Sequence, residues 1–165
     1  MYESDLDNEA EIRFKGWLDK HNIPYLYINQ EINTFSSVFK DKLKRPDFMV
    51  LLPNFGFIFV DVKNKEISEG YGNFPIDVNE TQKFSSLQRK FNLQVWYVLS
   101  NRHYNYDTWF WIPVSKVLES EIETKVSSKS KEDFFPIPVK EFIQISDNES
   151  IDSVFTKSFS NKNSP

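Results

Sequence analysis

The order of apolar patterns along this chain predicts an α/β fold, a mixed β-sheet core flanked by helices. Two strand-like runs joined by a tight turn predict an antiparallel hairpin. A helical pattern follows the hairpin and leads into a further buried strand, and a helix-connected crossover of this kind joins parallel strands. Because both kinds of connection occur in one chain, we expect one mixed sheet with helices packed on it.

The first part of the chain predicts a helix and a strand. Residues 8–20 place Ala10, Phe14, Trp17 and Leu18 at near-helical spacing, and Pro24 prevents the helix from continuing. Residues 24–32 alternate as a strand does, and residues 33–44 are polar enough for a loop or a short helical turn.

The hairpin is the clearest local prediction. Phe48–Leu52 and Phe57–Lys63 are two apolar runs, and the four residues between them, Pro-Asn-Phe-Gly, are turn formers. This spacing pairs Leu52 with Phe57 and Asp47 with Val62, to within a residue.

The remaining elements follow from composition and period. We expect a polar loop at 64–78, a helix at 79–91, a buried strand at 93–100 and another strand at 107–114. A short helix, a solvated connector at 127–133 and at best an edge strand at 134–145 come next, because two prolines interrupt that last segment.

Composition bounds the class of protein. The 165 residues suit a single domain, expected over 1–157, with a disordered tail at 158–165. There is no Cys, and no apolar run approaches the ~20 residues that span a bilayer, so we expect a cytoplasmic protein with no membrane association. The net charge of −4 disfavours tight non-specific binding of nucleic acid, although a local cationic groove can coexist with it.

Two carboxylates and an amine lie at neighbouring ends of the hairpin. Asp61 and Lys63 project from one face because side chains alternate along a strand. Asp47 begins the partner strand, so the three side chains can converge. Close carboxylates repel, and a hard cation such as Mg²⁺ with oxygen ligands removes that cost. Lys63 could then orient or deprotonate a water, or stabilise charge on a phosphate.

The same residues resemble a known family. Pro46-Asp47 followed by Asp61-Val62-Lys63 on a hairpin is similar to the signature of the PD-(D/E)xK nuclease superfamily, with its restriction-endonuclease-like and Holliday junction resolvase-like members. Upstream, Glu11 lies on the first helix, where family members carry a Glu. Downstream, Gln82 and Lys83 lie where some members carry a Gln or Lys. The resemblance covers about residues 8–114.

This resemblance implies a restriction-endonuclease-like fold and a metal-dependent nuclease. Mg²⁺ or Mn²⁺ would be held by Asp47, Asp61, the Val62 carbonyl and Glu11, directly or through water. Lys63 and Gln82 would complete the catalytic set. The implied partner is nucleic acid, DNA rather than RNA, and the function is also compatible with a homodimer or a partner protein.

Several alternatives stay open from the sequence alone. Glu9 competes with Glu11 for the catalytic role, and Gln82 and Lys83 could simply be a solvated helix start. Asp61 and Lys63 could form an exposed ion pair of little energetic value. At the level of function, the alternatives are a catalytically inactive nucleic-acid-binding or assembly module with the same fold, and a sheet protein whose aromatic surface binds a protein partner.

Overall fold

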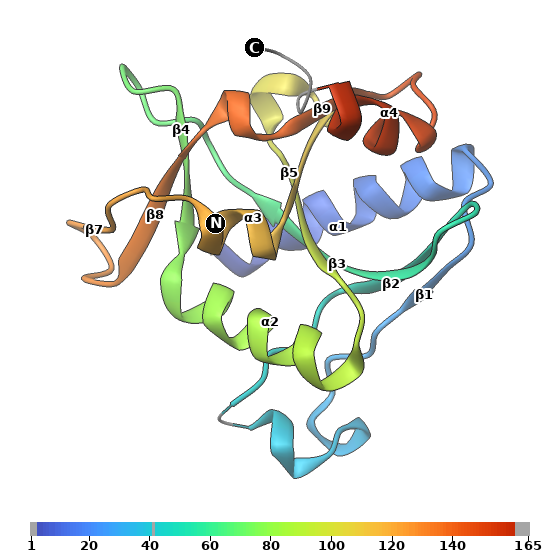
Figure 1. Ribbon diagram of the computed structural model, residues 1–165, viewed down its shortest axis with the longest axis horizontal. Helices are drawn as coiled ribbons and strands as arrows, with labels where there is room; N and C mark the ends of the chain where they lie inside the picture. Colours follow the sequence, from blue (N-terminus) through green and yellow to red (C-terminus); the bar gives the residue numbers. More distant parts are fainter. Residues whose placement is uncertain (1–2, 41, 161–165) are drawn as a thin grey trace.

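The computed structural model describes residues 3–40 and 42–160, which form two sheets and the helices that cover them (Figure 1). The helices are α1 (Glu3–Lys20), α2 (Val78–Phe91), α3 (Val114–Glu119) and α4 (Asp152–Ser160). The strands are β1 (Tyr25–Tyr27), β2 (Phe48–Leu52), β3 (Gly56–Asn64), β4 (Asn73–Asp77), β5 (Val95–Ser100), β6 (Thr108–Pro113), β7 (Lys125–Val126), β8 (Asp133–Pro138) and β9 (Ile143–Ser146). Short 3₁₀ turns lie at Ile32–Thr34, Ser37–Phe39, Arg102–Tyr104 and Val139–Glu141.

The large sheet is mixed, as the sequence predicts. Its six strands run in the order β1-β2-β3-β5-β6-β9, and a separate three-stranded sheet has the order β4-β8-β7. β3 and β5 are parallel and are connected through α2, whereas the other neighbours in the large sheet are antiparallel. The α/β prediction is therefore confirmed.

The hairpin forms with a register one residue from the expected one. Leu52 pairs with Gly56 rather than with Phe57, and Phe48 pairs with Val60. The turn needs left-handed backbone at Asn54, with φ of 61°, and a positive φ of 116° at Gly56. Asn and Gly adopt these conformations at low cost, which is why this segment turns where it does.

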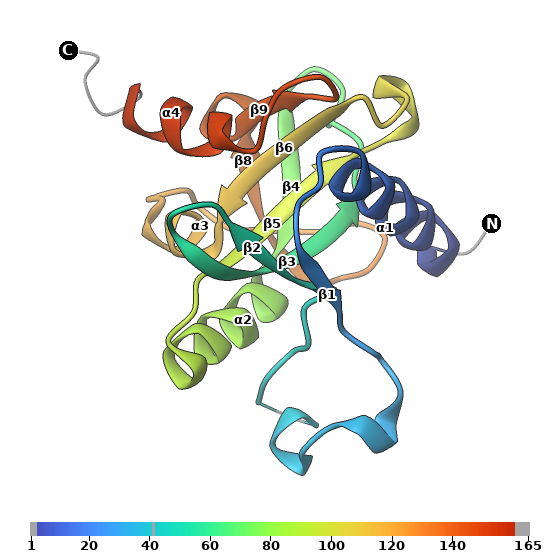
Figure 2. The same cartoon turned by 90° about the vertical axis from the view of Figure 1, so that its right-hand side faces the viewer.

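Each face of the large sheet carries its own apolar core. Figure 2 shows α1 across one face and α2 on the other side of the strands. On the α1 face, Phe14 is fully buried against Phe48, Trp109 and Trp111, with ring centroids 5.2 to 5.7 Å away. Alternation along the strands sends the other side chains to the α2 face, where α2, α3 and the small sheet cover them.

Three segments differ from the sequence prediction. The expected polar loop at 64–78 contains β4, and the segment 134–145 forms two strands, β8 in the middle of the small sheet and β9 at the edge of the large one. Residues 158–160 belong to α4 rather than to a disordered tail, and 161–165 lie outside the described residues. Among the described residues, no helix is both long and apolar enough to cross a membrane.

The prolines of β4 and β8 explain how β8 can be a middle strand. Pro75 pairs with Pro136, and Pro138 pairs with Asn73. Because two prolines opposite one another have no N–H to exchange, these are the non-hydrogen-bonded positions of the ladder, and their nitrogens face away from it. On β8, the proline nitrogens face the edge that β7 covers only in part, because β7 pairs with Asp133 and Phe134 alone.

Candidate active site

Asp47 ends the antiparallel ladder of the hairpin with its own side chain. Its backbone N–H donates to the Val60 carbonyl at 3.0 Å, and its Oδ2 accepts from the Val62 N–H at 2.7 Å. The Asp47 carboxylate thus accepts from the Val62 N–H in place of a backbone carbonyl of the neighbouring strand. This bond fixes a buried carboxylate at the point where β2 begins.

Asp61 and Lys63 lie on the face of β3 that α2 covers, as their spacing predicts. The Nζ of Lys63 is 3.1 Å from Oδ2 of Asp61, and the Asp61 side chain is almost completely buried. Only 15% of the Lys63 side chain is exposed. An exposed ion pair is therefore excluded, because both groups are withdrawn from solvent.

Burial and mutual repulsion make ionisation of the two carboxyls costly. Burial raises the pKa of Asp47, and the neighbouring charges of Asp61 and Glu11 raise it further. Burial also raises the pKa of Asp61, although the ammonium of Lys63 opposes that shift. A cation between the carboxylates would relieve both causes, since it compensates the charge that burial disfavours.

The atoms present fit a hard divalent cation. Asp47 and Asp61 offer carboxylate oxygens. The Val62 N–H bonds toward Asp47, so the carbonyl of the same residue projects to that side, beyond the first residue of β2, Phe48. Within the described ranges, no three His, Cys, Asp or Glu side chains cluster tightly enough to hold a metal ion by themselves. Two carboxylates with water and phosphate oxygens are the donor set that Mg²⁺ commonly takes.

Glu11 approaches Asp47 from the α1 side of the sheet. Its Oε2 accepts a hydrogen bond of 3.0 Å from the Tyr27 hydroxyl, and burial together with this carboxylate raises the pKa of Tyr27 to about 12. The charges of Asp61 and Glu11 act on Asp47, and the charges of Lys63, Glu80 and Lys44 act on Asp61.

Glu9, the competing candidate, is engaged elsewhere. Its Oε2 lies 2.8 Å from the guanidinium of Arg102, which follows β5. The structure therefore places Glu11 rather than Glu9 beside Asp47.

The helix that follows β4 brings Glu80 to the site, a residue that the sequence analysis missed. Its Oε1 is 2.9 Å from Lys63 and its Oε2 is 2.6 Å from Lys44. Burial opposes its ionisation, but the two ammonium groups outweigh that effect and lower the pKa of Glu80 to about 2. Gln82 is exposed, two residues further along α2 and so on another side of the helix. Its catalytic role stays a prediction without a contact to support it.

A local signal could have found Glu80. Asp77 caps α2, and its side chain accepts a hydrogen bond from the Glu80 N–H. An Asp followed three residues later by Glu marks a helix start, and it places Glu80 in the first turn, facing the sheet end.

Comparisons with known proteins agree with this fold. No protein-family model matches the sequence, and no curated protein is significantly similar to it. Among solved structures, Hjc of Archaeoglobus fulgidus, a Holliday junction resolvase from an archaeal hyperthermophile, superposes with a TM-score of 0.50 at 12% identity. That match covers 90% of this chain and 92% of the resolvase. D212, a nuclease from a fusselovirus, matches with a TM-score of 0.45 at 15% identity over 90% of this chain and 88% of the nuclease.

The mixed sheet and its flanking helices thus form a restriction-endonuclease-like fold, which the chain shares with the resolvase. The chain has the fold of the PD-(D/E)xK nucleases, with Asp47, Asp61 and Lys63 at the positions that carried the sequence resemblance. At this level of identity the likeness shows the fold, and the activity has to be argued from the site.

Proposed function

We propose that this protein is a metal-dependent nuclease that hydrolyses phosphodiester bonds of DNA. The observation that carries the proposal is the convergence of Asp47, Asp61 and Lys63 at the end of the hairpin, with both carboxylates buried. Neighbouring buried carboxyls with raised pKa values are common at functional sites, and a divalent cation is the ligand that offsets their charge. The fold, which a Holliday junction resolvase shares, supports the same conclusion.

The side chains have distinct roles in this proposal. Asp47, Asp61 and the Val62 carbonyl would hold Mg²⁺ or Mn²⁺, and Glu11 would contribute from the Asp47 side, directly or through water. The cation supplies positive charge against the phosphodiester and lowers the pKa of a water molecule. The bond of Asp47 to the Val62 N–H keeps its carboxylate oriented before any ligand arrives.

Lys63 acts on the reacting groups. Its ammonium lies beside Asp61 and donates a hydrogen bond to the attacking water or to a phosphate oxygen, which steadies the developing charge. The oxygen of water bonds to phosphorus and the bond to the 3′ oxygen breaks. The attacking water releases its proton to solvent and the 3′ oxygen gains one, which leaves a 5′-phosphate and a 3′-hydroxyl.

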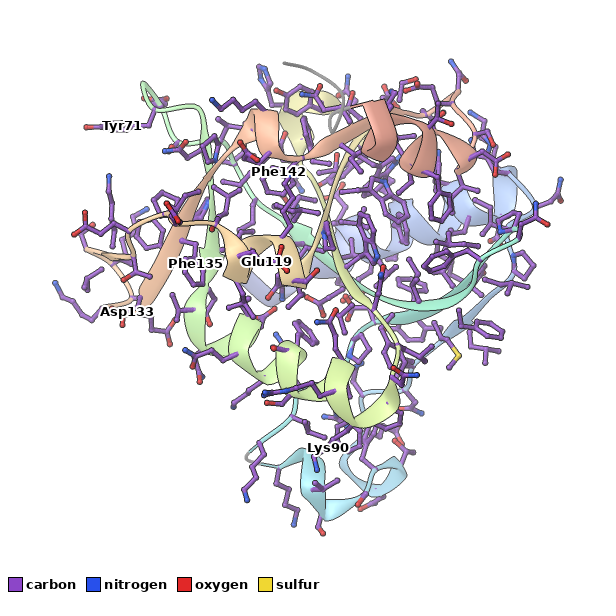
Figure 3. All side chains as sticks on the ribbon, in the orientation of Figure 1. Tyr71, Lys90, Glu119, Asp133, Phe135 and Phe142 are labelled. Atoms are coloured by element: carbon purple, nitrogen blue, oxygen red, sulfur yellow. The ribbon has the colours of Figure 1, made fainter. Side chains whose placement is uncertain are left out.

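Cleavage and metal titration test the proposal together. The wild-type protein should cleave plasmid or single-stranded DNA with Mg²⁺ or Mn²⁺ and not with EDTA. Asp61→Asn should abolish both cleavage and the calorimetric signal of divalent binding, because it removes one of the two carboxylate ligands. Glu119→Gln is the matched control, since Glu119 is an exposed carboxylate at the end of α3 (Figure 3). Equal metal binding by wild type and Asp61→Asn would contradict the proposal.

One observation favours a second function, a catalytically inactive nucleic-acid-binding module. Among the described residues, no group of three His, Cys, Asp or Glu side chains could hold a metal ion, and Glu11 contacts Tyr27. Such a module would bind nucleic acid equally well with and without divalent ions and would leave every substrate intact. The same assays therefore separate the two functions.

A further inference from the structure

Glu80 is a buried carboxylate beside the site to which the proposed function gives no task. Each of its oxygens contacts a different lysine, Oε1 to Lys63 and Oε2 to Lys44, at 2.9 and 2.6 Å. Its side chain is 16% exposed, so the contacts are sheltered from water. Ion pairs that are withdrawn from solvent hold their geometry better than exposed ones.

Glu80 lies at the start of α2, where its side chain could contact the helix cap but contacts the two lysines. A Glu three residues after a helix cap commonly turns back to the backbone N–H of the cap residue, which here is Asp77. Glu80 donates its own N–H to Asp77, but its carboxylate points to the lysines instead. The helix start is thus stabilised by Asp77 alone, and the Glu80 side chain is used across the interface with β3.

The two lysines come from different parts of the site. Lys63 follows Asp61 on β3, and its ammonium lies between Asp61 at 3.1 Å and Glu80 at 2.9 Å. Lys44 lies three residues before Asp47, on the segment that enters β2. The Glu80 carboxylate therefore connects β3, through Lys63, with the segment that enters β2, through Lys44.

We propose that Glu80 is a positioning residue that holds the Lys63 ammonium at the reacting phosphate, with Lys44 anchoring its second oxygen. The inference rests on the proposed nuclease function for its catalytic consequence. Its geometric part, the constraint of Lys63 by Glu80, stands without it. An ammonium held between two carboxylates from different elements has few conformations available, unlike that of a surface lysine. Its conformational entropy is therefore lost when the protein folds, and no further loss is needed to position it for the reaction.

The first test measures cleavage and metal binding by Glu80→Gln. We expect the turnover number to fall about 10- to 100-fold, the scale of a displaced catalytic group, with the Michaelis constant unchanged and the divalent affinity lowered only modestly by the lost negative charge. Glu119→Gln should match wild type. Lys44→Met should lower the turnover number less than Glu80→Gln, because it frees one oxygen of Glu80 but leaves the contact with Lys63.

The second test needs neither metal nor cleavage. With ¹⁵N-labelled lysine, the ammonium of Lys63 should give a slowly exchanging NMR signal, assigned by its loss in Lys63→Ala. In Glu80→Gln that signal should broaden into exchange with water, whereas Glu119→Gln should leave it in place. If Glu80→Gln does not fold, Glu80→Asp keeps the charge and shortens the side chain, and it should weaken the same signal.

Each failure has a distinct outcome. Wild-type turnover in Glu80→Gln would overturn the positioning role, and so would an unchanged Lys63 signal in that variant. Loss of divalent binding in Glu80→Gln would also overturn it, because Glu80 would then be a metal ligand. If wild type cleaves nothing, the nuclease proposal fails, and the NMR signal still decides whether Glu80 constrains Lys63.

Discussion

At the scale of single residues, removing the Lys63 ammonium should affect both reaction and folding. Lys63→Ala should lower cleavage by about 100-fold or more, the usual effect of losing one electrostatic stabiliser. Divalent affinity should be kept or improved, because a positive charge near the site opposes cation binding. Cleavage rates and calorimetric titration measure both effects. Cleavage equal to wild type would show that Lys63 has no catalytic role.

The same variant should be less stable without a metal ion. A strand-end lysine usually buries little, but this one contacts two buried carboxylates, Asp61 and Glu80. Leaving such charges uncompensated costs about 3 kcal/mol or more. Urea denaturation in EDTA should show this loss, and Mg²⁺ should restore part of it. Lys90→Ala, an exposed lysine at the end of α2 (Figure 3), is the control.

The buried carboxyls also predict a dependence of stability on pH. Burial raises the pKa of Asp61 to about 7 from 3.8 and also raises that of Asp47. The folded protein then binds more protons than the unfolded chain above pH 3.8, so stability should fall as pH rises toward 7 and beyond. The loss is on the order of 1.4 kcal/mol for each unit of raised pKa.

The effect of Glu80 on stability has the opposite dependence on pH, and it falls in a separate, more acidic pH range. Its pKa is lowered from 4.5 to about 2, so its contribution is present above pH 4.5 and is lost only below it. Urea denaturation at pH 5 and pH 8 in EDTA therefore reports the aspartates. Mg²⁺ should remove the decline, and so should the double variant Asp47→Asn, Asp61→Asn. A decline that persists in the double variant would assign it to other groups.

Much of the candidate site follows from sequence periodicity. Asp47, Asp61 and Lys63 could be placed together because a short hairpin and a period of two leave little freedom. For Glu80, the capping pattern with Asp77 indicates a position in the first turn of α2, but its approach to Lys63 depends on how α2 packs over β3. That packing is a tertiary property, which no local pattern near Glu80 contains.

At the scale of elements, the start of α2 sets the position of Glu80. Asp77→Ala removes the acceptor of the Glu80 N–H and should cost about 1 kcal/mol of stability. Cleavage should also fall, since the first turn of α2 carries Glu80. Thermal denaturation and cleavage rates measure the two effects. Asp77→Asn, which keeps a capping oxygen, should remain close to wild type; if it loses as much as Asp77→Ala, capping is not the cause.

Elements were predictable where the apolar residues are periodic or continuous, or where a turn is strong. β2, β3, α2, β5 and β6 were expected within a few residues of where they lie. β4 was missed because Pro75 and the polar residues before it resemble a loop, and its strand conformation depends on pairing with β8. Pairing between segments about sixty residues apart is not visible in either segment alone.

At the scale of the whole molecule, the aromatic cluster on the α1 face holds the first helix to the sheet. Phe14 contacts Phe48 from the hairpin and Trp109 and Trp111 from β6. Phe14→Ala should cost about 3–5 kcal/mol, the range for a buried Phe. Urea denaturation followed by Trp fluorescence measures it. Phe14→Leu should cost clearly less, and equal losses would show that cavity size is not the cause.

The prolines of the small sheet have a consequence for association between copies of the protein. Pro75 occupies the middle of the outer edge of β4, and Pro136 and Pro138 occupy the edge of β8 beyond β7. A further strand added at either of these edges would find no donor at these positions, which weakens edge-to-edge pairing there. Proline at these positions therefore disfavours the addition of a strand from another copy along β4 and along the uncovered part of β8.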